Sequence, residues 1–141
     1  MIKRLLLICL VFLLMGCTEK PKEEYIGTEV SVDPSSIITM MKQKEDMFLV
    51  VTLSSCPVCA EYLKVLDELV KNYEVVVYHI VIDEYEDQYD ELSQDYLDNL
   101  TDAPDSFFIV DGKIEDERVG FIQYRNLVDL LKENGLVEKN D

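Results

Sequence analysis

The chain has 141 residues, of which 48% are hydrophobic, and a formal net charge of −16. This length fits one domain with a buried core, and the hydrophobic share excludes an intrinsically disordered chain. The negative charge argues against nucleic acid or anionic lipid headgroups as partners, because both would repel it.

The first sixteen residues have the pattern of a secretory signal peptide. Lys3 and Arg4 form a basic start, residues 5–15 are apolar, and the segment LMGC ends at Cys17. This apolar run is too short to span a bilayer, which takes about 20 residues. It is typical instead of the central region of a signal peptide, so we predict one over residues 1–16.

The segment LMGC also resembles a bacterial lipobox, although Met15 is unusual at its position. The resemblance implies a diacylated Cys17 at the mature N-terminus and a lipid anchor in the cell membrane, facing the extracytoplasmic side. The alternative is an ordinary signal peptide or a membrane anchor that happens to end in cysteine. Residues 17–24 are polar and are predicted to form a short tether before a domain over residues 25–141.

The first half of this domain alternates strand and helix patterns. A short strand is predicted over 26–32, and Asp33 followed by Pro34 is typical of a helix start. Residues 47–53 are continuously apolar, as in a strand buried on both faces. An amphipathic helix follows, with apolar residues at positions 59, 62, 63, 66, 69, 70 and 73.

The second half continues the alternation. A second buried strand is predicted over 73–83, followed by an acidic stretch over 83–92 that leads into a helix. This stretch lacks the spacing and the glycine of a calcium-binding EF-hand loop. It is predicted instead to be the solvated start of the helix, which has Tyr85, Tyr89, Leu92, Tyr96 and Leu100 on one face. The Asp111–Gly112 pair predicts a hairpin, and a last helix is expected over 123–134. The pattern predicts an α/β fold, with a central mixed sheet and helices on both faces.

Two cysteines remain for the folded domain, because Cys9 lies in the signal peptide and Cys17 is the predicted lipid site. A disulfide between Cys56 and Cys59 closes too short a loop to stabilise the fold much. A structural zinc site needs four ligands, and the chain adds only His79, so we expect no zinc site. A copper site formed by these three residues is left open.

Redox exchange is the chemistry that suits the pair best. Cys59 lies on the apolar stripe of its helix and should face inward. Cys56 falls at the first turn, where unpaired amides and the helix dipole stabilise a thiolate. Pro57 is tolerated at this position and stiffens the turn. We therefore predict that Cys56 attacks, that Cys59 resolves, and that no cofactor is needed, since the cysteines carry the electrons.

The order of strand, CPVC at a helix start, strand, helix, proline, hairpin and helix resembles the thioredoxin family over residues 25–137. The resemblance implies a thioredoxin fold. It also implies a cis peptide bond before Pro104, which would face the redox pair. By the same analogy, the Ala103 backbone would pair with an extended substrate.

The chain departs from the thioredoxin pattern near the cysteines. Val50 replaces a buried aspartate, Ser55 replaces a tryptophan, and the central dipeptide is Pro-Val rather than Gly-Pro. His79 aligns with a family lysine and is a candidate proton relay to Cys59. The alternative is a histidine that is merely hydrogen-bonded at a strand position.

These observations predict a membrane-anchored, extracytoplasmic thiol–disulfide oxidoreductase, which we expect to be monomeric. Its partners would be cysteine-containing exported proteins or a membrane redox partner, and the direction of electron flow is left open. Two alternatives are kept. One is a non-catalytic thioredoxin-like accessory module of a secretion or bacteriocin export system. The other is a copper-handling lipoprotein.

Overall fold

The computed structural model describes residues 25–98, 100 and 102–138. The predicted signal peptide, the tether and Cys17 lie outside these residues. Within them, no helix is both long enough and apolar enough to cross a bilayer.

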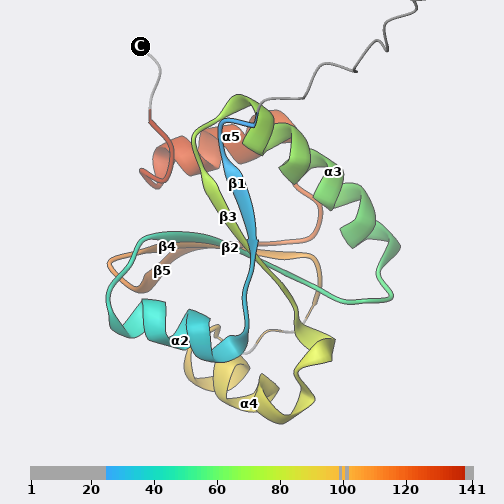
Figure 1. Ribbon diagram of the computed structural model, residues 1–141, viewed down its shortest axis with the longest axis vertical. Helices are drawn as coiled ribbons and strands as arrows, with labels where there is room; N and C mark the ends of the chain where they lie inside the picture. The colour runs from blue at the N-terminus through green and yellow to red at the C-terminus, as the bar shows by residue number, and fades with distance from the viewer. Residues whose placement is uncertain (1–24, 99, 101, 139–141) are drawn as a thin grey trace, which may run out of the picture.

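A five-stranded mixed sheet forms the centre of the domain, with the strand order β1-β3-β2-β4-β5 (Figure 1). The strands are β1 (Thr28–Ser31), β2 (Met47–Thr52), β3 (Val76–Val81), β4 (Asp105–Val110) and β5 (Lys113–Val119). β3 pairs in parallel with β1 and β2, whereas β4 pairs antiparallel with β2 and β5. The predicted mixed sheet is therefore confirmed.

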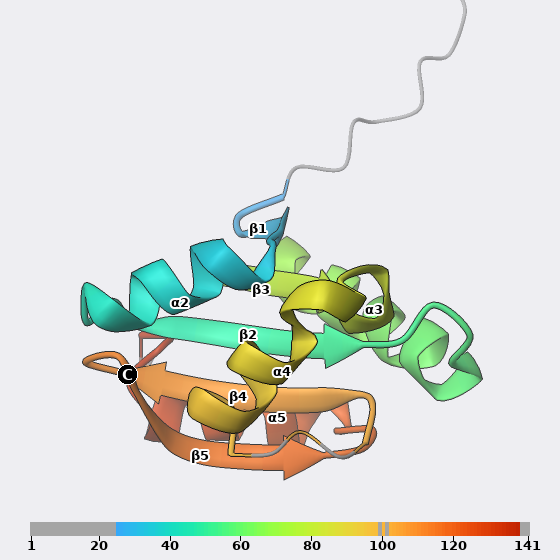
Figure 2. The same cartoon turned by 90° about the horizontal axis from the view of Figure 1, so that it is seen from below.

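Helices cover both faces of this sheet, as predicted (Figures 1 and 2). The helices are α2 (Pro34–Lys42), α3 (Pro57–Asn72), α4 (Glu86–Asp95) and α5 (Tyr124–Glu133), with a short 3-10 helix, η2 (Ile82–Glu84), before α4. α3 and α5 pack on one face, and α2 and α4 pack on the other. We call these the α3 face and the α4 face.

The two faces have separate cores because side chains alternate along each strand. On β2, Phe48 and Val50 point to the α3 face, whereas Leu49 and Val51 point to the α4 face. All six β2 residues are buried, which confirms the prediction of a strand covered on both sides.

The helix start at Asp33–Pro34 and the hairpin turn at Asp111–Gly112 are confirmed. Asp33 caps α2 by accepting a hydrogen bond from the Ser36 amide, and Pro34 is the first helical residue. Asp111 and Gly112 have positive φ angles of 53° and 72° at the tip of the β4–β5 hairpin. Such angles suit the Asp-Gly pair of a two-residue hairpin turn.

Two predicted boundaries are wrong. The strand predicted over 73–83 is limited to Val76–Val81, and only Val77 and Ile80 are buried in it, because its neighbour β1 is an exposed edge strand. The helix predicted to extend to Leu100 ends at Asp95, whereas the acidic stretch begins this helix, as predicted. Acidic residues in the first turn favour the helix dipole, so the acidic stretch itself can begin the helix.

Candidate active site

The redox pair lies where β2 ends and α3 begins. Cys56 caps the helix: its Sγ accepts a hydrogen bond from the Cys59 amide, with an N–S distance of 3.1 Å. Pro57 is the first helical residue. The two cysteines form a disulfide, and Cys56 is partly exposed whereas Cys59 is 2% exposed. The structure therefore has the predicted asymmetry of one partly exposed and one buried cysteine.

The loop before β4 lies against the redox pair. The Ala103–Pro104 peptide bond is cis, which confirms that prediction. The carbonyl oxygen of Ala103 lies 3.9 Å from the Sγ of Cys56. The carbonyl of Pro104 accepts a hydrogen bond of 2.7 Å from the Gly120 amide, which follows β5. The chain thus brings Pro57, Ala103 and Pro104 together around Cys56, as the family resemblance implied.

A hydrogen-bonded clamp that the sequence did not reveal holds the loop before Cys56. The Asp83 carboxylate accepts one bond of 2.9 Å from the Ser54 amide and another from the Ser54 hydroxyl. These bonds lower the pKa of Asp83. Asp83 lies in η2, so the clamp ties the cysteine loop to the end of the neighbouring strand β3. Residues 29 positions apart in sequence carry no local signal of such a contact.

Comparisons with known proteins agree with this geometry. No family model and no curated protein matches the chain. Among solved structures, thioredoxin O1 from Arabidopsis thaliana in its oxidised state is 25% identical, with a TM-score of 0.58 over 74% of this chain and 96% of that one. A mutant thioredoxin from Halobacterium salinarum is 19% identical, with a TM-score of 0.60 over 88% of this chain and 99% of that one.

The chain is a thiol–disulfide oxidoreductase with a thioredoxin fold. In the oxidised form, Cys56 is the partly exposed member of the disulfide. In the reduced form, the N-terminal amides of α3 stabilise a negative charge on the Cys56 sulfur. The buried Cys59 is one helical turn away and is placed to attack a mixed disulfide on Cys56.

The oxidoreductase lacks the buried aspartate at Val50, and His79 is the polar residue next to that position. His79 pairs in register with Val50, and its ring nitrogens contact Glu29 Oε1 at 3.1 Å and Thr52 Oγ1 at 2.7 Å. Its side chain is only 12% exposed. Both ring nitrogens of His79 therefore have hydrogen-bonding partners, as expected of a histidine that is merely hydrogen-bonded at a strand position. Its role as a proton relay stays a prediction.

The copper alternative gains little from this arrangement. Over the described part of the chain, no three His, Cys, Asp or Glu side chains gather as a metal site. In particular, His79 contacts Glu29 and Thr52 rather than the two cysteines.

A buried hydroxyl pair, also missed by the sequence analysis, lies one turn beyond Cys59. The Tyr62 hydroxyl is 2.9 Å from the hydroxyl of Ser106, and both residues are fully buried. Burial raises the pKa of Tyr62. Since Ser106 is paired with Val50 across the sheet, this neutral pair occupies the α3 face beside the position where the family carries its aspartate.

The adjacent residue, Asp105, has the opposite environment. It is fully buried, and neither of its carboxylate oxygens accepts a hydrogen bond from a donor group. Burial and then the nearby Glu117 carboxylate raise the pKa of Asp105 to about 7. Asp105 directly follows Pro104, so a titratable group lies beneath the loop that faces the cysteines. No sequence signal marks this residue, because an Asp at the start of a strand resembles a turn residue.

The surface near the redox pair includes exposed apolar side chains. Val58, between the two cysteines, is 50% exposed, and Phe121 is 45% exposed with its ring edge-on to Tyr62. Leu53 before the motif and Val119 at the end of β5 are also exposed. Such side chains suit contact with the backbone and apolar residues of a protein substrate.

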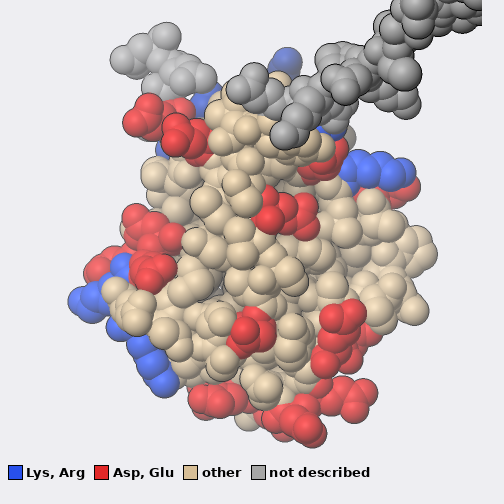
Figure 3. Space-filling view, in the orientation of Figure 1, with Lys and Arg blue, Asp and Glu red and all other residues tan. Residues whose placement is uncertain are grey.

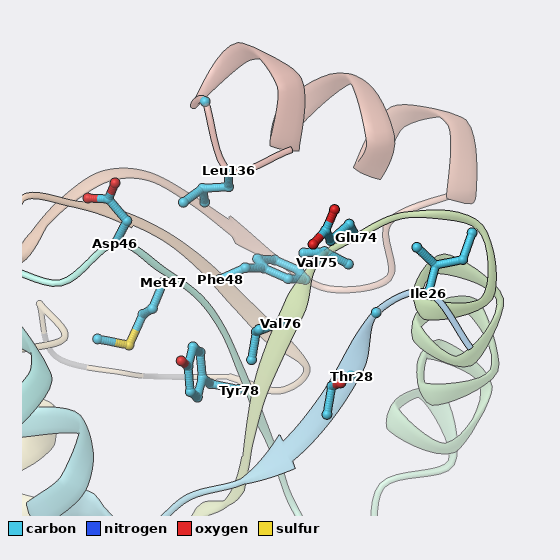
Figure 4. A pocket seen from close by; sticks show the side chains of 12 residues that line it. Ile26, Thr28, Asp46, Met47, Phe48, Glu74, Val75, Val76, Tyr78 and Leu136 are labelled. Atoms are coloured by element: carbon cyan, nitrogen blue, oxygen red, sulfur yellow. The ribbon is translucent and has the colours of Figure 1, made fainter. Parts of the chain in front are cut away.

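A pocket of about 490 Å³ lies elsewhere, at the amino ends of β1, β2 and β3 (Figure 4). Thr28, Phe48 and Val76 are among its lining residues. Cys56 instead follows the carboxyl end of β2. This pocket is therefore separate from the redox site.

Proposed function

We propose that this oxidoreductase is anchored in the cell membrane through a diacylated Cys17 and acts on the extracytoplasmic side. The lipobox-like segment LMGC after a basic and apolar start supports the anchor. The observation that carries the redox part is the accessible Cys56 at the helix N-terminus, disulfide-bonded to the buried Cys59. A protein at this location would meet exported proteins, whose cysteines form disulfides outside the cytoplasm.

The proposed exchange balances without a cofactor. In the reduced protein, the Cys56 thiolate attacks a substrate disulfide, forms a mixed disulfide and releases one substrate thiolate. The Cys59 thiolate then attacks the Cys56 sulfur, which releases the second substrate thiolate and forms the Cys56–Cys59 disulfide. Two electrons pass from the cysteine pair to the substrate, and oxidation of a substrate dithiol follows the same steps in reverse.

Substrate recognition would use the loop beside Cys56. An extended substrate segment would pair with the Ala103 backbone, while Pro104 and Pro57 shape the groove. Acidic side chains are numerous on the face shown in Figure 3, consistent with the net charge of −16. This charge disfavours strongly acidic substrates, so neutral or basic exported proteins, or a membrane redox partner, are the proposed partners.

Lipidation is tested by comparing two cysteine variants of the full chain in a bacterial host. Cys17→Ala should lose the lipid mass and leave the detergent phase on phase partitioning. Cys9→Ala, in the predicted signal peptide, is the matched control and should remain lipidated. Unchanged mass and partitioning of Cys17→Ala would contradict the anchor.

Substrates are tested by trapping. In Cys59→Ser the mixed disulfide cannot be resolved, so exported proteins should accumulate covalently on Cys56. The Cys56→Ser and Cys59→Ser double variant is the control and should trap nothing. A purified wild-type protein that exchanges no disulfide would instead support the non-catalytic accessory module, and stoichiometric copper binding would support the copper-handling lipoprotein.

A further inference from the structure

Asp105 and Glu117 form an acidic pair inside the domain, next to the substrate-facing loop. In the β4–β5 ladder, Asp105 is paired with Val119, and Glu117 is paired with Phe107. Val119 and Glu117 are two positions apart on β5 and therefore share a face. Asp105 and Glu117 are thus diagonal neighbours on the α4 face. Their carboxyl groups are close enough that Glu117 raises the pKa of Asp105.

The environment of Asp105 favours the protonated form of this pair. Asp105 is fully buried and Glu117 is partly buried. The charged groups that raise the pKa of Asp105 most are both acidic, namely Glu117 from β5 and Asp102 from the loop before Pro104. On β2 it faces Val51, which is apolar and fully buried. A buried carboxylate without a partner is costly, whereas one proton between two carboxyl groups supplies a hydrogen bond and removes a charge.

The position of the pair connects it to the redox site. The β5 chain that carries Glu117 continues to Gly120, whose amide donates to the Pro104 carbonyl. Pro104 in turn follows Ala103, whose carbonyl oxygen is 3.9 Å from the Sγ of Cys56. Repulsion between two carboxylates on β4 and β5 would therefore act on the strands that hold this loop.

We propose that Asp105 and Glu117 hold one proton between them and are positioning residues, which keep the Ala103–Pro104 loop in place to pair with a protein substrate. When this proton is lost, β4 and β5 separate near Pro104 and the backbone of Ala103 no longer pairs well. The cysteine chemistry itself is unchanged, because neither carboxyl group touches a sulfur. The inference depends on the redox activity of the cysteine pair and does not depend on the lipid anchor.

The test compares two kinds of disulfide substrate across pH. One is insulin, a protein that can pair with the Ala103 backbone, and the other is a small aromatic disulfide, which cannot. For each, the second-order exchange rate is measured from pH 5.5 to 9 for wild type and Asp105→Asn. Dividing the wild-type rate by the Asp105→Asn rate at each pH removes the pH dependence that Cys56 gives to both proteins.

With insulin, the wild-type rate should equal that of Asp105→Asn at pH 5.5 and fall to about one tenth of it at pH 9. With the small disulfide, the ratio should stay near one throughout. Glu117→Gln should remove the fall in the same way as Asp105→Asn and serves as the second variant if Asp105→Asn folds poorly. Glu115→Gln, an exposed carboxyl on the same strand, is the control and should keep the wild-type profile.

Three results would overturn the proposal. A wild-type-to-variant ratio with insulin that does not change with pH would show that the pair holds no proton of consequence. An equal fall with both substrates would place the effect on the Cys56 thiolate rather than on the loop. A ¹³C carboxyl signal of Asp105 that titrates in the same way in wild type and in Glu117→Gln would show that no proton is shared.

Discussion

The first two residues of β4 are both fully buried, yet their side chains meet opposite environments. Ser106 points to the α3 face and is hydrogen-bonded to Tyr62, whereas Asp105 points to the α4 face, where its oxygens meet no donor group and the Glu117 carboxyl acts on it. The first pair is neutral and satisfied, so it can serve as part of the core beneath Cys59. Asp105 instead carries a carboxyl group, and ionising it would place an unpaired charge in the interior, which is costly in free energy. Buried polarity is thus structural on one side of the strand and titratable on the other.

Substitutions in the redox pair should have the largest effect on the rate of disulfide exchange, because both cysteines take part in the reaction. Cys56→Ser should reduce disulfide exchange to the uncatalysed rate, since the accessible sulfur is lost. Cys59→Ser should still attack but should stop at the mixed disulfide, because no second thiol resolves it. Insulin reduction and mass spectrometry of trapped adducts measure both. Alkylation of reduced wild type near neutral pH should modify Cys56 before Cys59, and the reverse order would contradict the assignment.

Asp105 should make stability depend on pH. Its pKa of about 7 in the folded protein lies above the ordinary value of 3.8. Between about pH 4 and pH 7 the unfolded chain releases the proton while the folded chain retains it, so the free energy of unfolding should fall with rising pH. We expect a loss of up to about 4 kcal/mol across this window, which Asp105→Asn should remove. Urea unfolding at several pH values measures it, and Glu115→Gln should retain the wild-type slope.

On the α3 face, substitutions in the Tyr62–Ser106 pair should lower the free energy of unfolding by an amount that does not change with pH, as long as the pH stays below the range where tyrosine titrates. Tyr62→Phe leaves the buried Ser106 hydroxyl without its partner and should cost about 1–3 kcal/mol. Ser106→Ala similarly leaves the Tyr62 hydroxyl alone. The double variant should cost less than the sum of the two, because both polar groups are then removed. Strict additivity in urea unfolding would show that the hydroxyl pair contributes no net interaction.

His79 provides the smallest expected effect. A residue that carries a proton in catalysis typically contributes about 10²-fold or more to the rate. Since Glu29 and Thr52 already occupy both ring nitrogens, we expect His79→Gln to change the exchange rate by less than about tenfold. Stopped-flow measurement of the resolution step is the check. A larger loss together with an altered pH profile would establish the relay to Cys59.

Local patterns predicted much of the fold. The continuous apolar run of β2, the Asp33–Pro34 start of α2 and the Asp111–Gly112 hairpin are each specified by a few adjacent residues, and all three were predicted. The ends of β3 and α4 were not, because they depend on neighbours. β3 lies beside an exposed edge strand, and its end turns into η2 rather than continuing.

The sequence by itself also determined the redox pair. Spacing alone places Cys56 at a helix start and Cys59 on a buried stripe, since both positions follow from the helical period. Only the tertiary structure decided which polar groups meet around it. The Ser54–Asp83 clamp, the Tyr62–Ser106 pair and the Asp105–Glu117 pair join different elements. Their partners are set by strand order and register, and these arise from the packing of the whole sheet rather than from any local stretch of sequence.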